Sequence, residues 1–261
     1  MKEIFKYTFT TIADLKKFIF LTLILSILTL IEPFPVIGYS ALIFEKLILI
    51  SMGAFLIYLI KHSTSIENYF ENLKNNSFGS FLFHFIPTSS GILLGLFVIA
   101  TFWFIFLIII LQYTNSLSIL ANPHEILLSL SKTNFLTQLL LGIYSVYLLF
   151  YSYVFLGKFG ESLSKETFKE AFLSIISSLI DFRYWIKTFN LKYFLIYATW
   201  SFITILFYSI LSFTYIFVIF PTIIKNPNFS LIIIPILNAI TLILAYFTFF
   251  SAYFANKTTK N

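Results

Sequence analysis

The chain contains no cysteine, which excludes disulfide bonds, thiolate nucleophiles and cysteine-ligated metals. Its 3 histidines, His62, His84 and His124, are too scattered for a metal site, and no HExxH motif is present. The chain also lacks a glycine-rich phosphate loop, a Gly-x-Ser-x-Gly motif and an aspartate pair within its apolar segments. These absences predict a protein that is not an enzyme and binds no cofactor, metal or nucleic acid.

Charge is equally scarce. Only 11% of the 261 residues are charged and 59% are hydrophobic, with a mean hydropathy of +0.93. A soluble protein carries roughly 25% charged residues, and its core could not bury so much Phe, Ile and Leu. The composition therefore predicts a protein whose solvent is lipid.

Long apolar runs mark the expected membrane spans, because about 20 apolar residues cross the hydrocarbon core. We predict an all-α, polytopic membrane helix bundle with six transmembrane helices in a single domain, 1–261. The first run is short, and the second is a span only if Glu45 and Lys46 are tolerated inside it. The six runs cover 18–31, 36–60, 91–112, 135–156, 193–220 and 230–254.

The basic residues divide unequally between the two sides of this arrangement. Only Lys132 and Lys225 fall on one side, and Lys46 remains inside a span. By the positive-inside rule, both termini are cytoplasmic and the protein is a multi-pass protein of the cell membrane. The other side carries Lys2, Lys6, Lys16, Lys17, Lys61, Lys74, Lys158, Lys165, Lys169, Arg183, Lys187, Lys192, Lys257 and Lys260.

Two amphipathic segments resemble each other. Residues 2–19, KEIFKYTFTTIADLKKFI, align without gaps to 169–186, KEAFLSIISSLIDFRYWI. We expect 2–17 and 168–187 each to form a helix along the cytoplasmic interface, and Phe168, Phe172, Ile175, Leu179 and Ile186 to share one face of the second. The expected interfacial anchors are Phe5, Asp14, Phe172, Asp181 and Trp185, and both aspartates can also cap the helices that follow them.

A third amphipathic segment, 65–85, precedes the third span. The chain then divides into units 1–62, 63–156 and 157–261, each an interfacial helix followed by two spans. Biased composition with a free choice of offset is the alternative explanation of the match between the first and third units.

Four short pieces carry a family resemblance: DLKK at 14–17, PVIGY at 35–39, IENYFENL at 66–73 and ETFKEAF at 166–172. In this order the chain resembles an uncharacterised prokaryotic family of six-span membrane proteins, grouped as a domain of unknown function and commonest in archaea. The resemblance covers nearly the whole chain, although the acidic-proline signature expected after the second span is missing. It implies the six-span fold and no chemistry.

Few polar groups fall inside the spans. Glu45 is the candidate functional centre, with His84 or a polar group from another span as its expected partner, while the adjacent Lys46 points about 100° away around a helix. The alternative, which the prolines at 33 and 35 favour, is that 32–46 folds back as an external loop and the span begins at Leu47. We expect Asn238 in the last span to be bonded by a neighbouring helix.

A GxxxG motif, Gly91 and Gly95, allows close helix packing. We expect that packing to occur within the chain rather than in a dimer. Pro87, Pro221 and Pro235 can kink or end their spans.

The sequence favours a non-catalytic accessory or scaffold subunit. The expected partners are the lipid bilayer and a membrane or cytoplasmic protein. The alternative is the permease subunit of a transporter that works with a separate ATPase or other energising partner.

Overall fold

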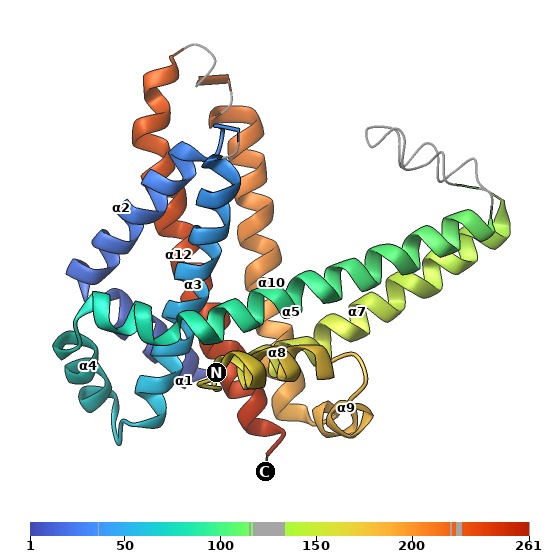
Figure 1. Ribbon diagram of the computed structural model, residues 1–261, viewed down its shortest axis with the longest axis horizontal. Coiled ribbons are helices and arrows are strands. Elements are labelled where there is room, and N and C mark those ends of the chain that lie inside the picture. The colour runs from blue at the N-terminus through green and yellow to red at the C-terminus, as the bar shows by residue number, and fades with distance from the viewer. Residues whose placement is uncertain (36, 115, 117–133, 220, 223–225, 261) are drawn as a thin grey trace.

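The computed structural model describes residues 1–261 except 36, 115, 117–133, 220, 223–225 and 261. Within these residues the chain is helical and contains no strand (Figure 1). Lys132 and Lys225, which the sequence assigns to the external side, lie outside the described residues. The elements are α1 (Lys2–Ile12), α2 (Leu15–Ile31), α3 (Ile37–Lys61), α4 (Ile66–Asn75), α5 (Phe78–Tyr113), α7 (Phe135–Leu163), α8 (Phe168–Ser177), α9 (Phe182–Thr188), α10 (Leu191–Thr214), a π-helical turn (Tyr215–Ile219), a 3-10 turn (Pro227–Phe229) and α12 (Ser230–Thr258).

Five of the described helical segments are long and apolar enough to cross a membrane, as expected of a multi-pass membrane protein. They are Ile37–Lys61, Phe83–Tyr113, Phe135–Leu163, Leu191–Phe217 and Ser230–Thr258. The first predicted run corresponds to α2, whose 17 residues span about 25 Å, slightly less than the hydrocarbon core of roughly 30 Å.

Four of the long helices, α2, α3, α10 and α12, run side by side and form what we call the bundle (Figure 1). The short helices α1, α4, α8 and α9 gather with both chain termini at one end of the molecule, which we call the base. Most of the basic residues that the sequence assigns to the cytoplasmic side lie on these short helices or in the segments beside them. The two termini therefore lie at the same end of the bundle.

The remaining long helices, α5 and α7, form a hairpin that leans away from the bundle (Figure 1). The first half of α5 packs across α3, and α8 packs along α5, while the last turns of α7 pack on α12. The distal halves of both helices extend beyond these contacts. The 36 residues of α5 span about 54 Å, far more than a bilayer core, so the helix must tilt strongly or run partly along the interface.

Buried side chains concentrate where α3, α12, the start of α5 and the end of α7 meet the base. Their largest fully buried members include Tyr69, Tyr193, Tyr246 and Phe250. By contrast α10, with 24 residues, buries only Tyr193 and Ile196, both near its start. The fold thus has a packed core toward the base and apolar helices that separate above it.

Small and polar groups join the helices where the sequence predicted such contacts. A Cβ atom at Gly91 would overlap the carbonyl oxygen of Phe168, and one at Gly95 would lie 2.7 Å from Ile175 Cγ2. The GxxxG motif therefore packs within the chain, as predicted, although its partner is the short helix α8 rather than another span. Asn238 Nδ2 donates to Thr29 Oγ1 at 3.1 Å, so the predicted bond from Asn238 to a neighbouring helix is confirmed, and that helix is α2.

Two local predictions need correction. Residues 168–187 do not form one helix, because the chain turns at 178–181 between α8 and α9. The predicted unit boundary at 156 falls inside α7. Of the two effects predicted for the prolines, Pro87 and Pro235 do not end their helices, because both lie within continuous helices, and a kink at either stays a prediction.

The side chains predicted to share one apolar face of 168–187 are not buried together. Ile175 is fully buried, whereas Phe168 is 41% exposed and Ile186 is 71% exposed. The turn at 178–181 rotates α9 relative to α8, so side chains beyond it cannot continue the same face.

Candidate functional site

Glu45 lies on α3 inside a candidate span, and its residue is only 7% exposed. The favoured interpretation was that 32–46 folds back as a loop and the span begins at Leu47. It is wrong from residue 37 onward, because the helix is continuous from Ile37. The carboxylate is paired with Lys46, whose Nζ lies 2.5 Å from Glu45 Oε1. The expectation that Lys46 would be a poor partner is also wrong, because its long side chain folds back along the helix.

Glu32 completes this group from the end of α2, and we call Glu32, Glu45 and Lys46 the carboxylate cluster. Glu32 and Glu45 share a side-chain hydrogen bond, which requires a proton on one of the two groups. Burial, the hydrogen bond and the charge of Glu45 raise the pKa of Glu32, and Lys46 opposes them.

His84 does not belong to this cluster, contrary to the prediction. Its side chain is exposed, and its ring meets the edge of the neighbouring Phe85 ring at 4.8 Å. Phe85 packs against Phe55 at 6.3 Å between ring centroids. Since Phe55 follows Glu45 by ten residues on α3, His84 lies roughly 15 Å along the helix axis from the carboxylates.

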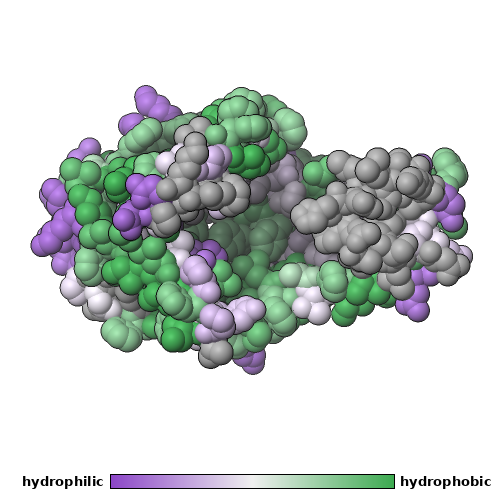
Figure 2. All heavy atoms as spheres, turned by 90° about the horizontal axis from the view of Figure 1, so that it is seen from above, coloured by the Kyte–Doolittle hydropathy of each residue, from purple (hydrophilic) through white to green (hydrophobic). Residues whose placement is uncertain are grey.

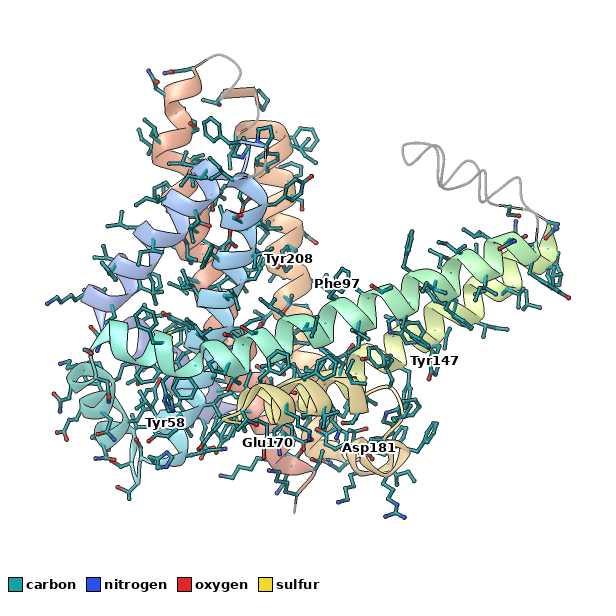
Figure 3. The ribbon with its side chains drawn as sticks, viewed as in Figure 1. Tyr58, Phe97, Tyr147, Glu170, Asp181 and Tyr208 are labelled. Atoms are coloured by element: carbon teal, nitrogen blue, oxygen red, sulfur yellow. The ribbon has the colours of Figure 1, made fainter. Side chains whose placement is uncertain are left out.

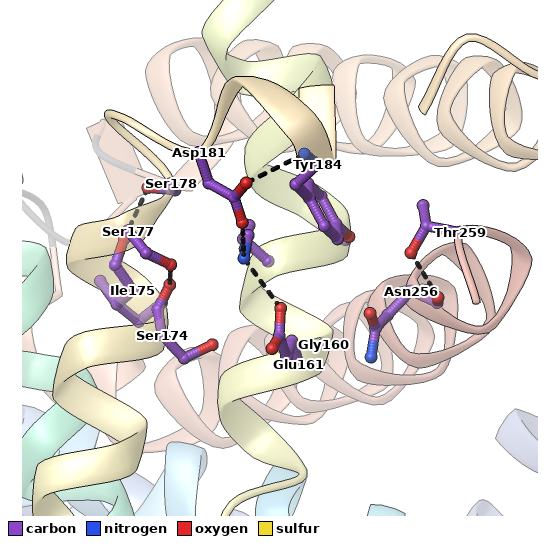
Figure 4. A network of polar contacts seen from close by, with 12 residues as sticks. Gly160, Glu161, Ser174, Ile175, Ser177, Ser178, Asp181, Tyr184, Asn256 and Thr259 are labelled. Carbon is purple, nitrogen blue, oxygen red and sulfur yellow. Dashed lines mark hydrogen bonds and ion pairs between the residues drawn. The ribbon is translucent and has the colours of Figure 1, made fainter. Parts of the chain in front are cut away.

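A second polar group, the lysine cluster, lies at the base (Figure 4). Lys158 on α7 is only 4% exposed, and its Nζ lies 2.8 Å from Asp181 Oδ2 and 3.0 Å from Glu161 Oε2. The same ammonium lies 4.4 Å from the centroid of the Tyr184 ring. A buried ammonium needs such partners, since an unpaired charge away from water is costly.

Asp181 has a double role in the lysine cluster. Besides pairing with Lys158, it caps α9 by accepting a hydrogen bond from the Tyr184 amide at 3.0 Å. Burial opposes ionisation of Asp181, but the hydrogen bonds from Lys158 and the Tyr184 amide outweigh it, so the pKa of Asp181 is lowered. One carboxylate thus connects the turn before α9 to α7 (Figure 4).

A small cavity of about 210 Å³ adjoins the lysine cluster. It lies between α7, α9 and the end of α12, where Asn256 Oδ1 is buried without a hydrogen-bond partner. Its volume corresponds to roughly seven water molecules. The cavity therefore suits solvent or a very small ion rather than an organic substrate.

Glycines allow the close approach of helices around this cluster. Side chains at Gly157 would collide with the Tyr184 hydroxyl group, and side chains at Gly160 with the backbone of α12 at Ala252. The Tyr193 hydroxyl group accepts from the Gly157 amide at 3.0 Å and donates to the Tyr153 carbonyl at 2.6 Å. Tyr193 thereby bridges two backbone groups one turn apart on α7.

The predicted interfacial anchors take different positions. Asp14 caps α2 by accepting a hydrogen bond from the Lys17 amide at 3.5 Å. Asp181 caps α9 in the same way, by accepting from the amide three residues later. The capping prediction is therefore confirmed at both aspartates. Trp185 is 9% exposed, and its indole donates to the Ser178 carbonyl at 3.0 Å.

The two phenylalanine anchors both contact other rings. The Phe5 ring lies 5.4 Å from that of Phe247 on α12, and the Phe172 ring stacks on that of Phe168 at 6.1 Å. Phe5 therefore faces the bundle.

Sequence reasoning missed Glu32, Lys158, Glu161 and Tyr184. Lys158 was counted only as a loop charge, although Lys158 and Glu161 are three residues apart, a spacing that places them on one helix face. Within the described residues, no three His, Asp or Glu side chains are placed to hold a metal ion. Among the described residues, the ion pair between Lys158 and Asp181 joins α7 to the turn before α9, whereas Glu45 and Lys46 pair within α3.

Comparison of the chain with family models, with curated proteins and with solved structures found no match.

Proposed function

We propose that the chain crosses the cell membrane six times, with both termini in the cytoplasm. Five helical segments meet the length and hydropathy of a span, and α2 packs against α3 and α12 before it slants away from α3 (Figure 1). A short helix such as α2 is accommodated by local thinning of the bilayer. The basic residues beside the short helices of the base support the cytoplasmic assignment of that end.

Within the membrane, we propose a non-catalytic scaffold or accessory role in which the protein holds a transmembrane helix of a partner. One observation carries this proposal. The molecule is hollowed between the bundle and the hairpin, and green, hydrophobic surface forms the floor of the hollow in the view from above, with white and purple residues along part of its rim (Figure 2). We call this space the opening.

Both walls of the opening carry large exposed apolar side chains. Phe97 points from α5 toward the opening and is 69% exposed, and Tyr208 on α10 is 59% exposed (Figure 3). Further along the same helices, Phe104 on α5 and Ile205 on α10 are 55% and 66% exposed. An apolar helix would cover these side chains in place of lipid, and the aromatic rings supply contact area for close packing.

The polar groups of the spans support a structural role. Ser51 and Ser89 hydrogen-bond to each other at 2.7 Å between α3 and α5, and Asn238 is bonded to α2. These contacts use polar side chains to join helices, as is common in membrane bundles.

A permease subunit is the second candidate, favoured by the carboxylate cluster. Charged groups inside a membrane frequently mark ion or proton pathways, and Glu45 is buried in a candidate span beside Glu32 and Lys46. A transport role predicts that an energising ATPase co-purifies with the chain. It also predicts that Glu45→Gln abolishes transport while the assembly stays intact.

Site-specific photo-crosslinking in the native membrane tests the scaffold role. A photoreactive residue at Phe97 or Tyr208 should form an adduct with one membrane protein, and the linked peptide should be an apolar segment of about 20 residues. The same residue at Ile27, which is 58% exposed on α2 away from the opening, is the matched control and should label lipid.

Specific docking further requires that Phe97→Arg lower co-purification of that partner while Ile27→Arg does not. Lipid adducts alone at Phe97 and Tyr208 would contradict the scaffold role. Adducts to a peptide outside a transmembrane segment would contradict it as well.

A further inference from the structure

A groove of about 910 Å³ lies at the junction of α2 and the end of α4, near the base. Its lining changes character along its length. One end is formed by polar and charged residues of both elements, and the other by apolar side chains of α2. The lining residues are Asp14, Lys16, Lys17, Ile19, Phe20, Leu23, Lys74, Asn75, Asn76 and Ser77.

The charges at the polar end do not balance. Asp14 is already paired with Lys17, whose Nζ lies 3.2 Å from Asp14 Oδ2 and also donates to the carbonyl groups of Leu73 and Lys74. Lys17 thus ties the start of α2 to the end of α4. Lys16 and Lys74 are both exposed, and no ion pair with either is found among the described residues.

The apolar end continues from these lysines along one face of α2. Lys16, Phe20 and Leu23 follow at helical spacings of four and three residues, so they lie above one another on the same face. Phe20 is 49% exposed and Leu23 is 50% exposed, and Ile19 beside them is 55% exposed. Cationic and amide groups therefore lie at the base, and an apolar stripe runs from them into the span.

We propose that this groove binds one anionic phospholipid. Lys16 and Lys74 bind the phosphate group, Asn75 and Asn76 line the groove beside it, and an acyl chain lies along Ile19, Phe20 and Leu23. The cationic end of the groove lies where the headgroup of a lipid in the adjacent leaflet would lie, and the apolar stripe lies where its acyl chain would lie. The site is independent of the opening and of any partner protein.

Native mass spectrometry of the full-length protein tests the site. The protein is released from nanodiscs that contain equal amounts of phosphatidylglycerol and phosphatidylcholine. We expect preferential retention of one phosphatidylglycerol. The double variant K16Q/K74Q should lower this preference about tenfold or more, since a lysine near a lipid phosphate contributes about 1 kcal/mol.

The matched control is K2Q/K169Q, which removes two exposed lysines outside the groove and should keep the preference. Equal retention of the two lipids by the wild-type protein would overturn the proposal. An equal loss of preference in both double variants would overturn it too, because general surface charge would then explain the effect.

A second measurement uses only the wild-type fold. Phosphatidylglycerol with a photoreactive group on its acyl chain should form adducts on residues 19–23 of α2, and excess unlabelled phosphatidylglycerol should compete them away. Excess phosphatidylcholine should compete poorly. Adducts spread evenly over the apolar helices, or equal competition by both lipids, would refute the groove as a site.

Discussion

Gly91 on α5 lies so close to Phe168 on α8 that a single added carbon would overlap the Phe168 carbonyl oxygen. The obstacle is backbone, which cannot rotate away as a side chain can. Gly91→Leu should therefore push α8 off α5 and lower the free energy of unfolding by about 3 kcal/mol, the upper end of typical overpacking costs. Thermal unfolding in detergent measures the effect.

Gly142 on α7 provides the control, because a Cβ there meets nothing within 4 Å. Gly142→Leu should leave the unfolding temperature unchanged or raise it slightly, since a helical glycine is entropically unfavourable. Equal unfolding temperatures for the two variants would show that α5 and α8 are not packed as described.

Lys158→Met should destabilise the base, because it leaves Asp181 and Glu161 without their shared cation. Breaking a buried ion pair costs 3–5 kcal/mol, and the partial exposure of both carboxylates reduces this to about 2–3 kcal/mol. Lys169→Met on the exposed side of α8 should change little.

The triple variant K158M/E161Q/D181N separates lost charge pairing from lost packing, because it leaves no unpaired charge. It should recover part of the stability that K158M loses. A triple variant as unstable as K158M would refute the ion-pair explanation. Unfolding in denaturant compares all three proteins.

Asp181 predicts a dependence of stability on pH. Its pKa in the folded protein lies below the ordinary value of 3.8, so its contribution is fully present above that value and is lost as pH falls through the lower, folded pKa. Asp181→Asn keeps a residue that caps helices well but removes the charge. Unfolding measured from pH 7 down to about pH 3 should therefore show a steeper loss in the wild-type protein than in D181N. Parallel curves would contradict this role of Asp181.

Glu45 and Lys46 are neighbours on α3 with very different access to the surroundings. The Glu45 side chain is 9% exposed and that of Lys46 is 48% exposed. Since the chain has no native cysteine, Glu45→Cys and Lys46→Cys each introduce a single thiol. Because Lys46 lies on the outer surface of the candidate span, a membrane-permeant thiol reagent should label position 46 much faster than position 45, and equal rates would contradict the burial of Glu45.

Properties that follow from periodicity and length were predictable from the sequence. The long apolar runs located five helical segments to within a few residues, except that α5 begins earlier than expected and α7 ends at Leu163 rather than at 156. Asp14 and Asp181 were recognisable as caps, because the residue type and its position before an apolar run identify a helix start. The GxxxG motif likewise indicated close packing.

Contacts between distant segments were not predictable in this way. Nothing local to Lys158 shows that Asp181, 23 residues later, will fold back onto it. The choice of His84 as partner for Glu45 failed for the same reason, because the level at which α5 crosses α3 depends on the packing of both helices. The fold-back of Lys46 toward Glu45 depends on side-chain rotamers, which helical periodicity does not specify.

The α5–α7 hairpin is held at one end only, so a small rotation at that end would move the other end by a larger distance. Its contacts with α3, α8 and α12 lie near the base, whereas the end of α5 at Tyr113 follows Gly91 by 22 residues, or about 33 Å. A rotation of about 10° where α5 meets α8 would therefore move the far end by about 6 Å. A small change in the seating of α8, which the turn at 178–181 joins to the Lys158 ion pairs, would be amplified into a change in the width of the opening.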